Sequence, residues 1–172
     1  MVGERIALTV LEAADEDDVI AAHRLSREYH APWAAPCIDR DGFAAWLEAA
    51  SQPTHCALVA RRIEDGAIAG IINFSQIALG NFCSAYLGYH GNVACAGQGL
   101  MTEALRLAVG RAFATLGLHR VEANIQPGND RSIALIRRSG FRKEGFSPRY
   151  LMIDGAWRDH ERWAVTREDW QG

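Results

Sequence analysis

The sequence predicts an α/β (α+β) fold in which an antiparallel meander of strands leads through a glycine loop into a long helix. Three local patterns predict this class. Two apolar runs, 56–63 and 67–74, flank Glu64-Asp65-Gly66, which is typical of a β-hairpin. Gly97-Gln98-Gly99 passes directly into a stretch with one broad apolar helical face. Near the end of the chain, Asp154-Gly155 separates two further strand-like runs.

Size and composition indicate an ordinary globular protein. The chain has 172 residues, of which 49% are hydrophobic and 23% charged, so we expect residues 1–172 to form one domain. A net charge of −3 without a run of Lys and Arg argues against a nucleic-acid partner. No segment resembles a membrane span or a signal peptide, which favours a cytoplasmic protein with no membrane partner. The four cysteines lack C-x-x-C spacing, so neither disulfides nor a metal site is expected.

The first half of the chain supplies most of the predicted sheet. Alternating polar and apolar residues indicate strands, and acidic residues in the first turn mark the starts of helices. In order, the expected elements are a strand at 5–11, helices at 15–28 and 39–50, and strands at 56–63, 67–74 and 82–89. The third strand of this meander delivers the chain to the glycine loop.

The second half begins with the helix that follows the glycines, expected to end at Gly117. A strand at 118–126 then places the polar side chains of Glu122, Asn124 and Gln126 on one face. These side chains form a polar row beside the glycine loop.

A short helix at 129–139 has recognisable signals at both ends. Asn129 is a suitable N-cap, and Gly140-Phe141 fits a Schellman stop in which Phe141 covers Ile136. The chain closes with a β-ribbon, expected at 150–153 and 158–165 around a type I′ turn.

The glycine loop is suited to binding an anion. Glycines allow the backbone to approach a phosphate closely, and the first turn of the next helix presents unpaired N–H groups and the positive end of the helix dipole. The ligand is therefore expected to carry a phosphate or a pyrophosphate. Because glycines before a helix more often only make a turn, the surrounding residues decide the assignment.

Those surroundings resemble the GNAT superfamily of acetyl-CoA-dependent N-acetyltransferases. The order strand, G-Q-G and helix is followed by a strand, P-x-N-x-x-S, a helix and G-F. The segment at 150–160, Tyr-Leu-Met-Ile-Asp-Gly-Ala-Trp-Arg-Asp-His, resembles the RimJ/RimL-type ribosomal-protein alanine N-acetyltransferases. The resemblance spans about 82–170. It implies a mixed, mostly antiparallel sheet of about seven strands flanked by helices, with splayed central strands that admit CoA.

The resemblance also implies roles for individual residues. The pyrophosphate of CoA would be held by backbone N–H groups of Ala96, Gly97, Gln98, Gly99, Leu100 and Met101. The pantetheine arm would pair with the strand end formed by Leu87, Gly88, Tyr89 and His90. Asn129 would contact that arm, and Ser132 would protonate the departing thiolate, although serine is also an ordinary residue in the first turn of a helix.

Two departures from the family pattern concern CoA binding and the general base. Ala94 and Cys95 replace a polar and a bulky residue that many relatives carry before the loop, so CoA binding is expected to rest on backbone groups. Arg149 stands where relatives carry an acidic residue, which leaves no obvious base. A carboxylate that could act through water is Glu122, and the alternative is that Glu122 is solvated or structurally paired.

The chemistry favours an α-amine as acceptor. An α-amino group has a pKa near 8, so about a tenth of it is neutral at pH 7, whereas a lysine side chain is almost fully protonated. We therefore expect direct attack of a neutral amine on acetyl-CoA, with a strand amide near Tyr89 polarising the carbonyl. No metal or covalent acyl-enzyme is required.

The leading hypothesis for the acceptor is a protein N-terminus, plausibly that of a ribosomal protein. Side chains expected to shape the acceptor site are Tyr29, Trp33 and Tyr150. Two alternatives stay open: acetylation of a small amine such as an antibiotic, polyamine or amino acid, and a non-catalytic CoA-binding regulatory module. The sequence is compatible with either a monomer or a homodimer.

Overall fold

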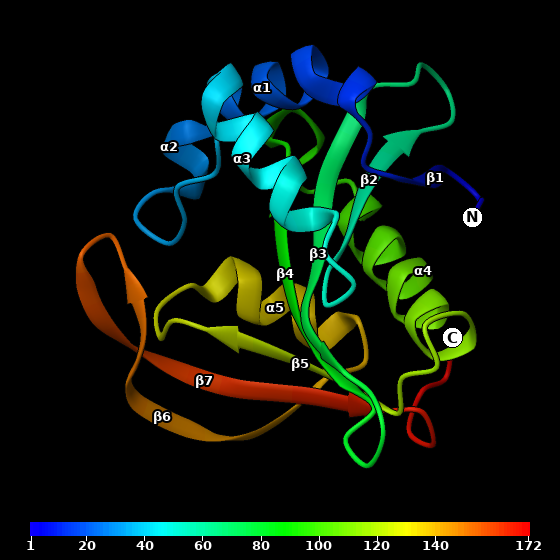
Figure 1. Cartoon of the computed structure of the whole chain (residues 1–172), viewed down its shortest axis with the longest axis vertical. Coiled ribbons are helices and arrows are strands. Elements are labelled where there is room, and N and C mark those ends of the chain that lie inside the picture. Colours follow the sequence, from blue (N-terminus) through cyan, green and yellow to red (C-terminus); the bar gives the residue numbers. More distant parts are fainter.

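The computed structural model describes residues 1–172, which build one seven-stranded sheet in the order β1-β2-β3-β4-β5-β7-β6 (Figure 1). All neighbouring strands are antiparallel except β4 and β5, which are parallel. The strands are β1 (Ile6–Val10), β2 (Cys56–Arg62), β3 (Ile68–Ala78), β4 (Ser84–Gly91), β5 (Arg120–Ile125), β6 (Arg142–Ile153) and β7 (Ala156–Thr166). This mixed, mostly antiparallel sheet confirms the predicted fold class.

Helices cover both faces of the sheet. One group is α1 (Glu16–Leu25), α2 (Arg27–His30) and α3 (Arg40–Ala50), and the other is α4 (Leu100–Ala114) and α5 (Asp130–Arg138). Two 3-10 turns, η1 (Ala13–Asp15) and η2 (Val93–Cys95), complete the structure. Figure 1 shows the first group at one end of the molecule and α4 behind β2 and β3.

Alternation along the strands builds two apolar cores. On β2, Leu58 and Ala60 belong to the larger core with α4 and α5, whereas Ala57 and Val59 belong to the smaller core with α1 and α3. This is the two-residue period expected of a strand buried on both faces. The central strands are therefore fixed in register from both sides.

The predicted chain reversals are confirmed in their hydrogen bonds. The N–H of Phe141 donates to the carbonyl of Ile136 (3.2 Å) and that of Gly140 to the carbonyl of Arg137 (3.1 Å), which is the Schellman pattern. Asp154 and Gly155 have φ values of 50° and 72°, as a type I′ turn requires. Local sequence signals thus determine where α5 ends and where the closing ribbon turns.

Several expected bounds differ from the observed ones: the helix expected to end at Gly117 ends at Ala114, the strand expected at 67–74 runs to Ala78, and two elements differ more. The helix expected at 15–28 is interrupted at Ser26, whose buried hydroxyl accepts a hydrogen bond from the N–H of Val93 (3.0 Å). The ribbon strand expected to start at residue 150 begins at Arg142. β6 is an edge strand with mostly exposed side chains and a register shift between Ser147 and Leu151, so it shows no clear alternation of polar and apolar residues.

The parallel pair of strands separates soon after it forms, as predicted. β4 pairs with β5 only from Ser84 to Tyr86, opposite Arg120 to Glu122, although β4 continues to Gly91. Figure 1 shows the two strands diverging beyond this point. The far end of β4 therefore has one free backbone edge, which faces the candidate site.

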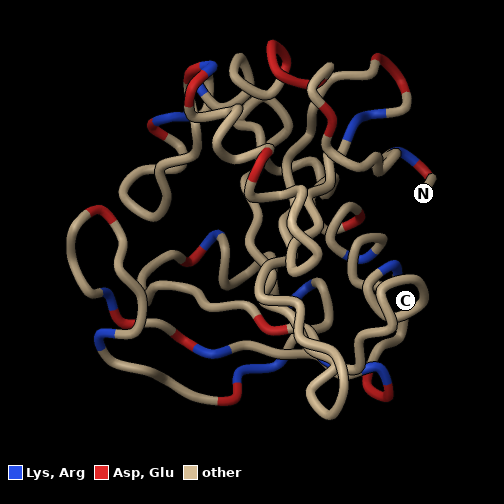
Figure 2. The backbone as a smooth tube through the Cα atoms, viewed as in Figure 1, with Lys and Arg blue, Asp and Glu red and all other residues tan.

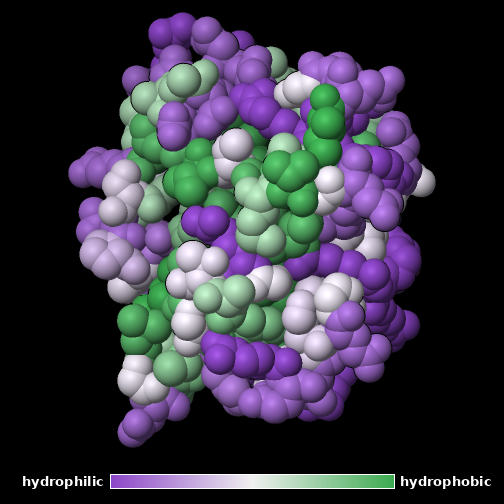
Figure 3. Space-filling model, turned by 90° about the vertical axis from the view of Figure 1, so that its right-hand side faces the viewer, coloured by the Kyte–Doolittle hydropathy of each residue, from purple (hydrophilic) through white to green (hydrophobic).

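The surface has no single dominant character. Figure 2 shows acidic and basic residues interspersed over the molecule rather than gathered by sign. On the face drawn in Figure 3, apolar residues form a broken area that hydrophilic residues surround. None of the helices has the length and apolar character needed to cross a lipid bilayer.

Candidate active site

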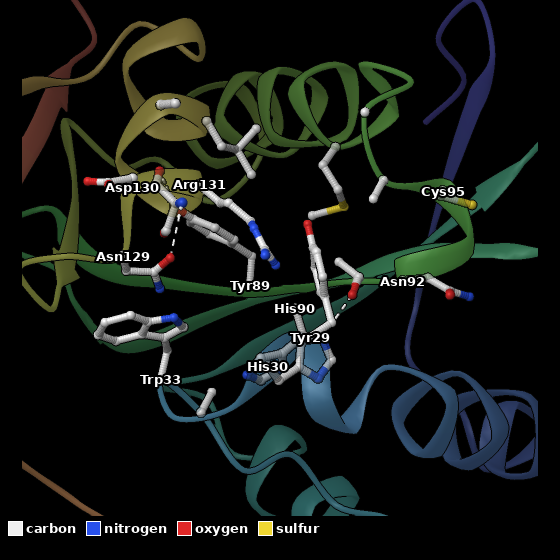
Figure 4. Close-up of a pocket in the computed structure, with 18 of the residues that line it drawn as sticks. Tyr29, His30, Trp33, Tyr89, His90, Asn92, Cys95, Asn129, Asp130 and Arg131 are labelled. Carbon is white, nitrogen blue, oxygen red and sulfur yellow. Dashed lines mark hydrogen bonds between the residues drawn. The ribbon is translucent and has the colours of Figure 1, made fainter.

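A cavity of about 1040 Å³ lies where β4 and β5 diverge. Four segments form its walls: α2 with the loop after it, the end of β4, the glycine loop with the first turn of α4, and the start of α5. Figure 4 shows side chains from these segments pointing toward one another across the cavity. Segments that are far apart in the sequence therefore meet at one site.

The glycine loop presents a run of free backbone donors. Gly97 and Gly99 both have φ of +77°, a conformation that strongly favours glycine. The successive N–H groups of residues 97–101 donate to no acceptor within the chain. They lie at the N-terminus of α4, where the helix dipole adds positive potential, so the loop fits a phosphate or pyrophosphate group.

The N-terminal strand supports this loop from behind. The Arg5 guanidinium donates to the carbonyl of Gln98 (3.0 Å) and pairs with the carboxylate of Glu103 on α4 (3.0 Å). The same carboxylate accepts the backbone N–H groups of Arg5 and Ile6. These bonds fix the loop to β1 and hold its donors in place.

The free edge of β4 presents backbone groups to the cavity in alternation. Asn92 N–H donates to the carbonyl of Ala69 (2.8 Å), and hydrogen-bonded pairs alternate along an antiparallel ladder. With Tyr89 opposite Ile72 in the same register, the N–H of Tyr89 points away from β3 and toward the opening. Leu87 is turned to the same side, but the pairing of Tyr86 with Glu122 uses its N–H for β5, whereas Gly88 and His90 direct their backbone groups to β3. Of the four predicted pantetheine contacts, Tyr89 alone therefore offers a free N–H to the cavity.

The start of α5 brings two hydroxyl groups together. Asn129 caps the helix, because its side-chain oxygen accepts the N–H of Ser132 (3.2 Å). The hydroxyl oxygens of Ser132 and Tyr89 lie 2.6 Å apart. Burial raises the pKa of Tyr89 to about 12 against the opposing effect of its hydrogen bond to Ser132, so Tyr89 keeps its proton near neutral pH.

The opposite wall is formed by α2 and the loop that follows it. Tyr29 and Trp33 line the cavity, and the side chain of Gln126 donates to the carbonyl of Trp33 (3.2 Å). The guanidinium carbon of Arg131 lies 4.8 Å from the centre of the Tyr29 ring. Contacts from β5 and α5 therefore hold this wall in place.

Comparison with known proteins identifies the family of this site. The model of the acetyltransferase (GNAT) domain matches residues 5–142. The chain belongs to the GNAT acetyltransferases.

Two GNAT relatives of known sequence show how close the match is. The [ribosomal protein uS5]-alanine N-acetyltransferase of Escherichia coli K12 is 47% identical over 103 residues, which are 60% of this chain and 53% of that protein. The probable N-acetyltransferase YjcK of Bacillus subtilis is 39% identical over 105 residues, 61% of this chain and 58% of that protein. The match thus spans little more than half the length of these relatives.

Solved GNAT structures share the complete fold. RimJ of Mycobacterium smegmatis in complex with CoA-disulfide has a TM-score of 0.84 at 28% identity, over 97% of this chain and 84% of that one. The ribosomal-protein-S5-alanine acetyltransferase of Vibrio fischeri has a TM-score of 0.85 at 24% identity, over 100% of this chain and 98% of that one. A Vibrio cholerae spermidine N-acetyltransferase with CoA and spermine has a TM-score of 0.82 at 17% identity, over 99% of this chain and 100% of that one. The last two similarities concern the fold alone.

In this GNAT chain, Glu122 is a paired residue. Its carboxylate accepts hydrogen bonds from Arg120 (2.9 Å) and Arg162 (2.7 Å), and its side chain does not line the cavity. Burial alone would raise the pKa of Glu122, but the hydrogen bonds and charges of the two arginines outweigh it and lower that pKa. This geometry favours the structural alternative over the general base.

Tyr150 also lies outside the cavity. Its hydroxyl is 3.2 Å from that of Tyr86, and the Arg162 guanidinium packs 5.0 Å from its ring centre. The side chain therefore stabilises the ribbon against β4, and its acceptor contact stays a prediction.

The remaining predicted residues divide between the cavity wall and its support. Those that line the cavity are Tyr29, Trp33, Tyr89, His90, Ala96, Gly97, Gly99, Met101, Asn129 and Ser132. Those that do not are Leu87, Gly88, Gln98 and Leu100. For Gln98 and Leu100 this leaves the predicted role intact, because that role concerns backbone N–H groups.

Four charged residues of the wall were not predicted as site residues: Glu28, Asp130, Arg131 and Arg138. Arg131, Leu135 and Arg138 follow one another at i, i+4 and i+7, so they share a face of α5. This helical spacing, which starts one residue before Ser132, is the sequence signal that could have placed the two arginines on the cavity wall.

Behind the cavity, three histidine rings pack together. The centre of the His90 ring lies 5.7 Å from the centre of the His23 ring and 5.5 Å from that of the His30 ring. His23 Nδ1 bonds to the carbonyl of Cys37 and His30 Nε2 to that of Gly91, each at 2.8 Å, so these nitrogens carry the protons. The other nitrogens, His23 Nε2 and His30 Nδ1, are buried without a partner.

Despite these histidines, no group of three or more His, Cys, Asp or Glu residues is arranged to hold a metal ion.

Cys95, at the edge of the glycine loop, is 6% exposed, and burial raises the pKa of its thiol. It packs as a small apolar residue rather than as a reactive thiolate.

Proposed function

We propose that this chain is an acetyl-CoA-dependent N-acetyltransferase that acts on the α-amine of a protein N-terminus. The observation that carries the proposal is the meeting of two features in one cavity. The free N–H groups of residues 97–101 suit the pyrophosphate of CoA, and the capped start of α5 holds Ser132 on the same cavity wall. A GNAT domain match and an alanine N-acetyltransferase relative support the same reaction.

Binding would begin at the glycine loop. The loop N–H groups and the N-terminus of α4 would hold the phosphates of acetyl-CoA. Arg138 lines the same cavity and forms no ion pair within the chain, which leaves its charge available for an anionic ligand. These groups compensate for Ala94 and Cys95, which supply no polar side chain there.

Transfer would then follow from the groups around the diverging strands. The N–H of Tyr89, free of β3, would polarise the acetyl carbonyl while the neutral amine nitrogen attacks its carbon. The new C–N bond forms as the C–S bond breaks, Ser132 donates its hydroxyl proton to the leaving thiolate, the amine loses a proton to water, and water returns a proton to Ser132. Holding both substrates in one cavity contributes much of the acceleration.

The acceptor assignment rests on the chemistry of the amine. Glu122 is engaged by two arginines, and a base is least needed for an α-amine, part of which is already neutral at pH 7. The name of the Escherichia coli relative, a [ribosomal protein uS5]-alanine N-acetyltransferase, points in the same direction.

Thiol release from acetyl-CoA tests the proposal directly. Purified protein is assayed with short peptides that start with Ala or Ser, with the same peptides blocked at the N-terminus, and with spermidine and lysine. We expect turnover of the free peptides alone. Thermal stabilisation by acetyl-CoA without thiol release from any acceptor would instead identify a non-catalytic CoA-binding module.

A further inference from the structure

Arg131 reaches across the cavity to the wall where the acceptor would bind. It stands in the first turn of α5, one residue before Ser132, and its guanidinium packs against the ring of Tyr29 on α2 at 4.8 Å. Figure 4 shows the Arg131 side chain extending toward Tyr29 between the two walls. The stacking holds a planar cation close to the residue expected to act on the thioester.

The charge of Arg131 is not neutralised by the chain. It forms no ion pair, although Glu28 and Asp130 also line the cavity. The other cation of the wall, Arg138, stands at the far end of α5, seven residues after Arg131, where its backbone carbonyl accepts a hydrogen bond from Arg106 of α4 (3.1 Å). The two cations thus lie at different ends of the cavity, and Arg131 is the one beside the acceptor wall.

The two acceptor classes respond differently to a fixed guanidinium. A peptide N-terminus carries one amine and, three bonds from its nitrogen, a carbonyl oxygen that can accept hydrogen bonds from arginine. A polyamine carries several ammonium groups and no such oxygen, so a nearby cation only repels it. Glu28, on the same wall as Tyr29, can attract the amine of a peptide N-terminus or one ammonium group of a polyamine.

We propose that Arg131, held by Tyr29, is a specificity-determining residue that selects peptide N-termini and rejects polyamines by binding the acceptor's first carbonyl. This inference rests on the proposed acetyl transfer to N-terminal amines. It names Arg131 as the side chain that lets the site distinguish a peptide N-terminus from a polyamine.

The test compares kcat/KM for an Ala-starting peptide amide and for spermidine in wild type, Arg131→Gln and Arg131→Glu. In Arg131→Gln we expect about a tenfold loss for the peptide, carried mainly by its KM, and a rise for spermidine. In Arg131→Glu both changes become larger. The KM for acetyl-CoA should stay within about twofold in both variants, since the inferred contact is with the acceptor.

Arg27→Gln is the matched control, because Arg27 is an exposed cation on α2 that does not line the cavity. It changes the net charge by the same amount as Arg131→Gln and should leave kcat/KM for both acceptors unaffected. An unchanged ratio of peptide to spermidine in both Arg131 variants would overturn this inference while leaving acetyl transfer intact. Wild type that acetylates neither acceptor would overturn the proposed function and this inference together.

Discussion

The hydroxyl oxygens of Tyr89 and Ser132 lie 2.6 Å apart, and they join the end of β4 to the start of α5. Each hydroxyl has one proton, so only one of them can donate in this bond. Burial keeps Tyr89 protonated, since its pKa is raised to about 12. When Tyr89 donates, the proton of Ser132 is free to point into the cavity, which is what proton transfer to a thiolate requires.

Ser132→Ala is therefore expected to lower kcat by about a hundredfold, in the range typical for loss of a general acid. Because the variant keeps the backbone N–H that Asn129 caps, the KM for acetyl-CoA should change little. Steady-state kinetics measure both values. An unchanged kcat would mean that Ser132 is only a first-turn helix residue.

Tyr89→Phe tests whether Tyr89 acts through Ser132. Removing the hydroxyl should reduce kcat by about tenfold in the wild-type background and have almost no further effect in Ser132→Ala, since coupled residues are not additive. A double-mutant cycle on kcat gives the coupling. Equal effects of Tyr89→Phe in both backgrounds would show that the two hydroxyls act independently.

Glu122→Gln is expected to affect stability and not the pH profile of catalysis. The carboxylate, whose side chain is 16% exposed, pairs with Arg120 and Arg162, and losing its charge should cost about 1–3 kcal/mol of unfolding free energy. Its pKa is lowered in the folded state, so this stabilisation is present above the unfolded pKa and is lost as pH falls. Denaturant unfolding at pH 7 and at pH 4 measures the loss. A shifted acidic limb of kcat/KM would restore Glu122 as a candidate base.

Asn129→Ala should weaken both the fold and the site. Loss of the N-cap bond to Ser132 is expected to cost about 1 kcal/mol and to loosen the first turn of α5. Asn129→Ser, which keeps a capping oxygen, is the control for stability. If both variants unfold alike in denaturant, the cap is not what the asparagine contributes.

Features determined by a few neighbouring residues could be predicted from the sequence. The Schellman stop at Gly140, the type I′ turn at Asp154 and the cap at Asn129 each depend on backbone preferences within four or five residues. The glycine loop belongs to this group as well, because its positive φ values and its free N–H groups are both local properties.

Features that depend on contacts between distant segments could not be predicted. The pairing of Glu122 with Arg162 joins residues 40 apart, and the contact of Arg131 with Tyr29 joins α5 to α2. The splayed strands and an amide near Tyr89 are expected only through the family resemblance, and it is the register of β4 against β3 that turns the N–H of Tyr89, and not that of Gly88, toward the cavity. Sequence spacing alone does not encode these choices, since they arise only when the sheet is assembled.

The histidines behind the cavity give the protein an expected sensitivity to acid. Burial lowers the pKa of His90 to about 3, assisted by the charges of its two neighbours, and burial also lowers the pKa of His23. The unfolded chain, with ordinary histidine pKa values near 6.5, therefore binds protons that the folded chain excludes. Stability from this cluster is complete above about pH 6.5 and falls as pH drops toward the folded pKa values, by up to about 1.4 kcal/mol per pH unit for each group.

His90→Gln should flatten this dependence, because it removes the most strongly shifted ring and one of the two neighbours of the unpartnered nitrogens of His23 and His30. Urea unfolding at pH 7.5 and pH 5 measures the difference, with His119→Gln as the control, since His119 is exposed and lies outside the cluster. We expect wild type and His119→Gln to lose stability equally between the two pH values, and His90→Gln to lose about 1 kcal/mol less. An equal loss in all three proteins would mean that the cluster is not the source of the acid sensitivity.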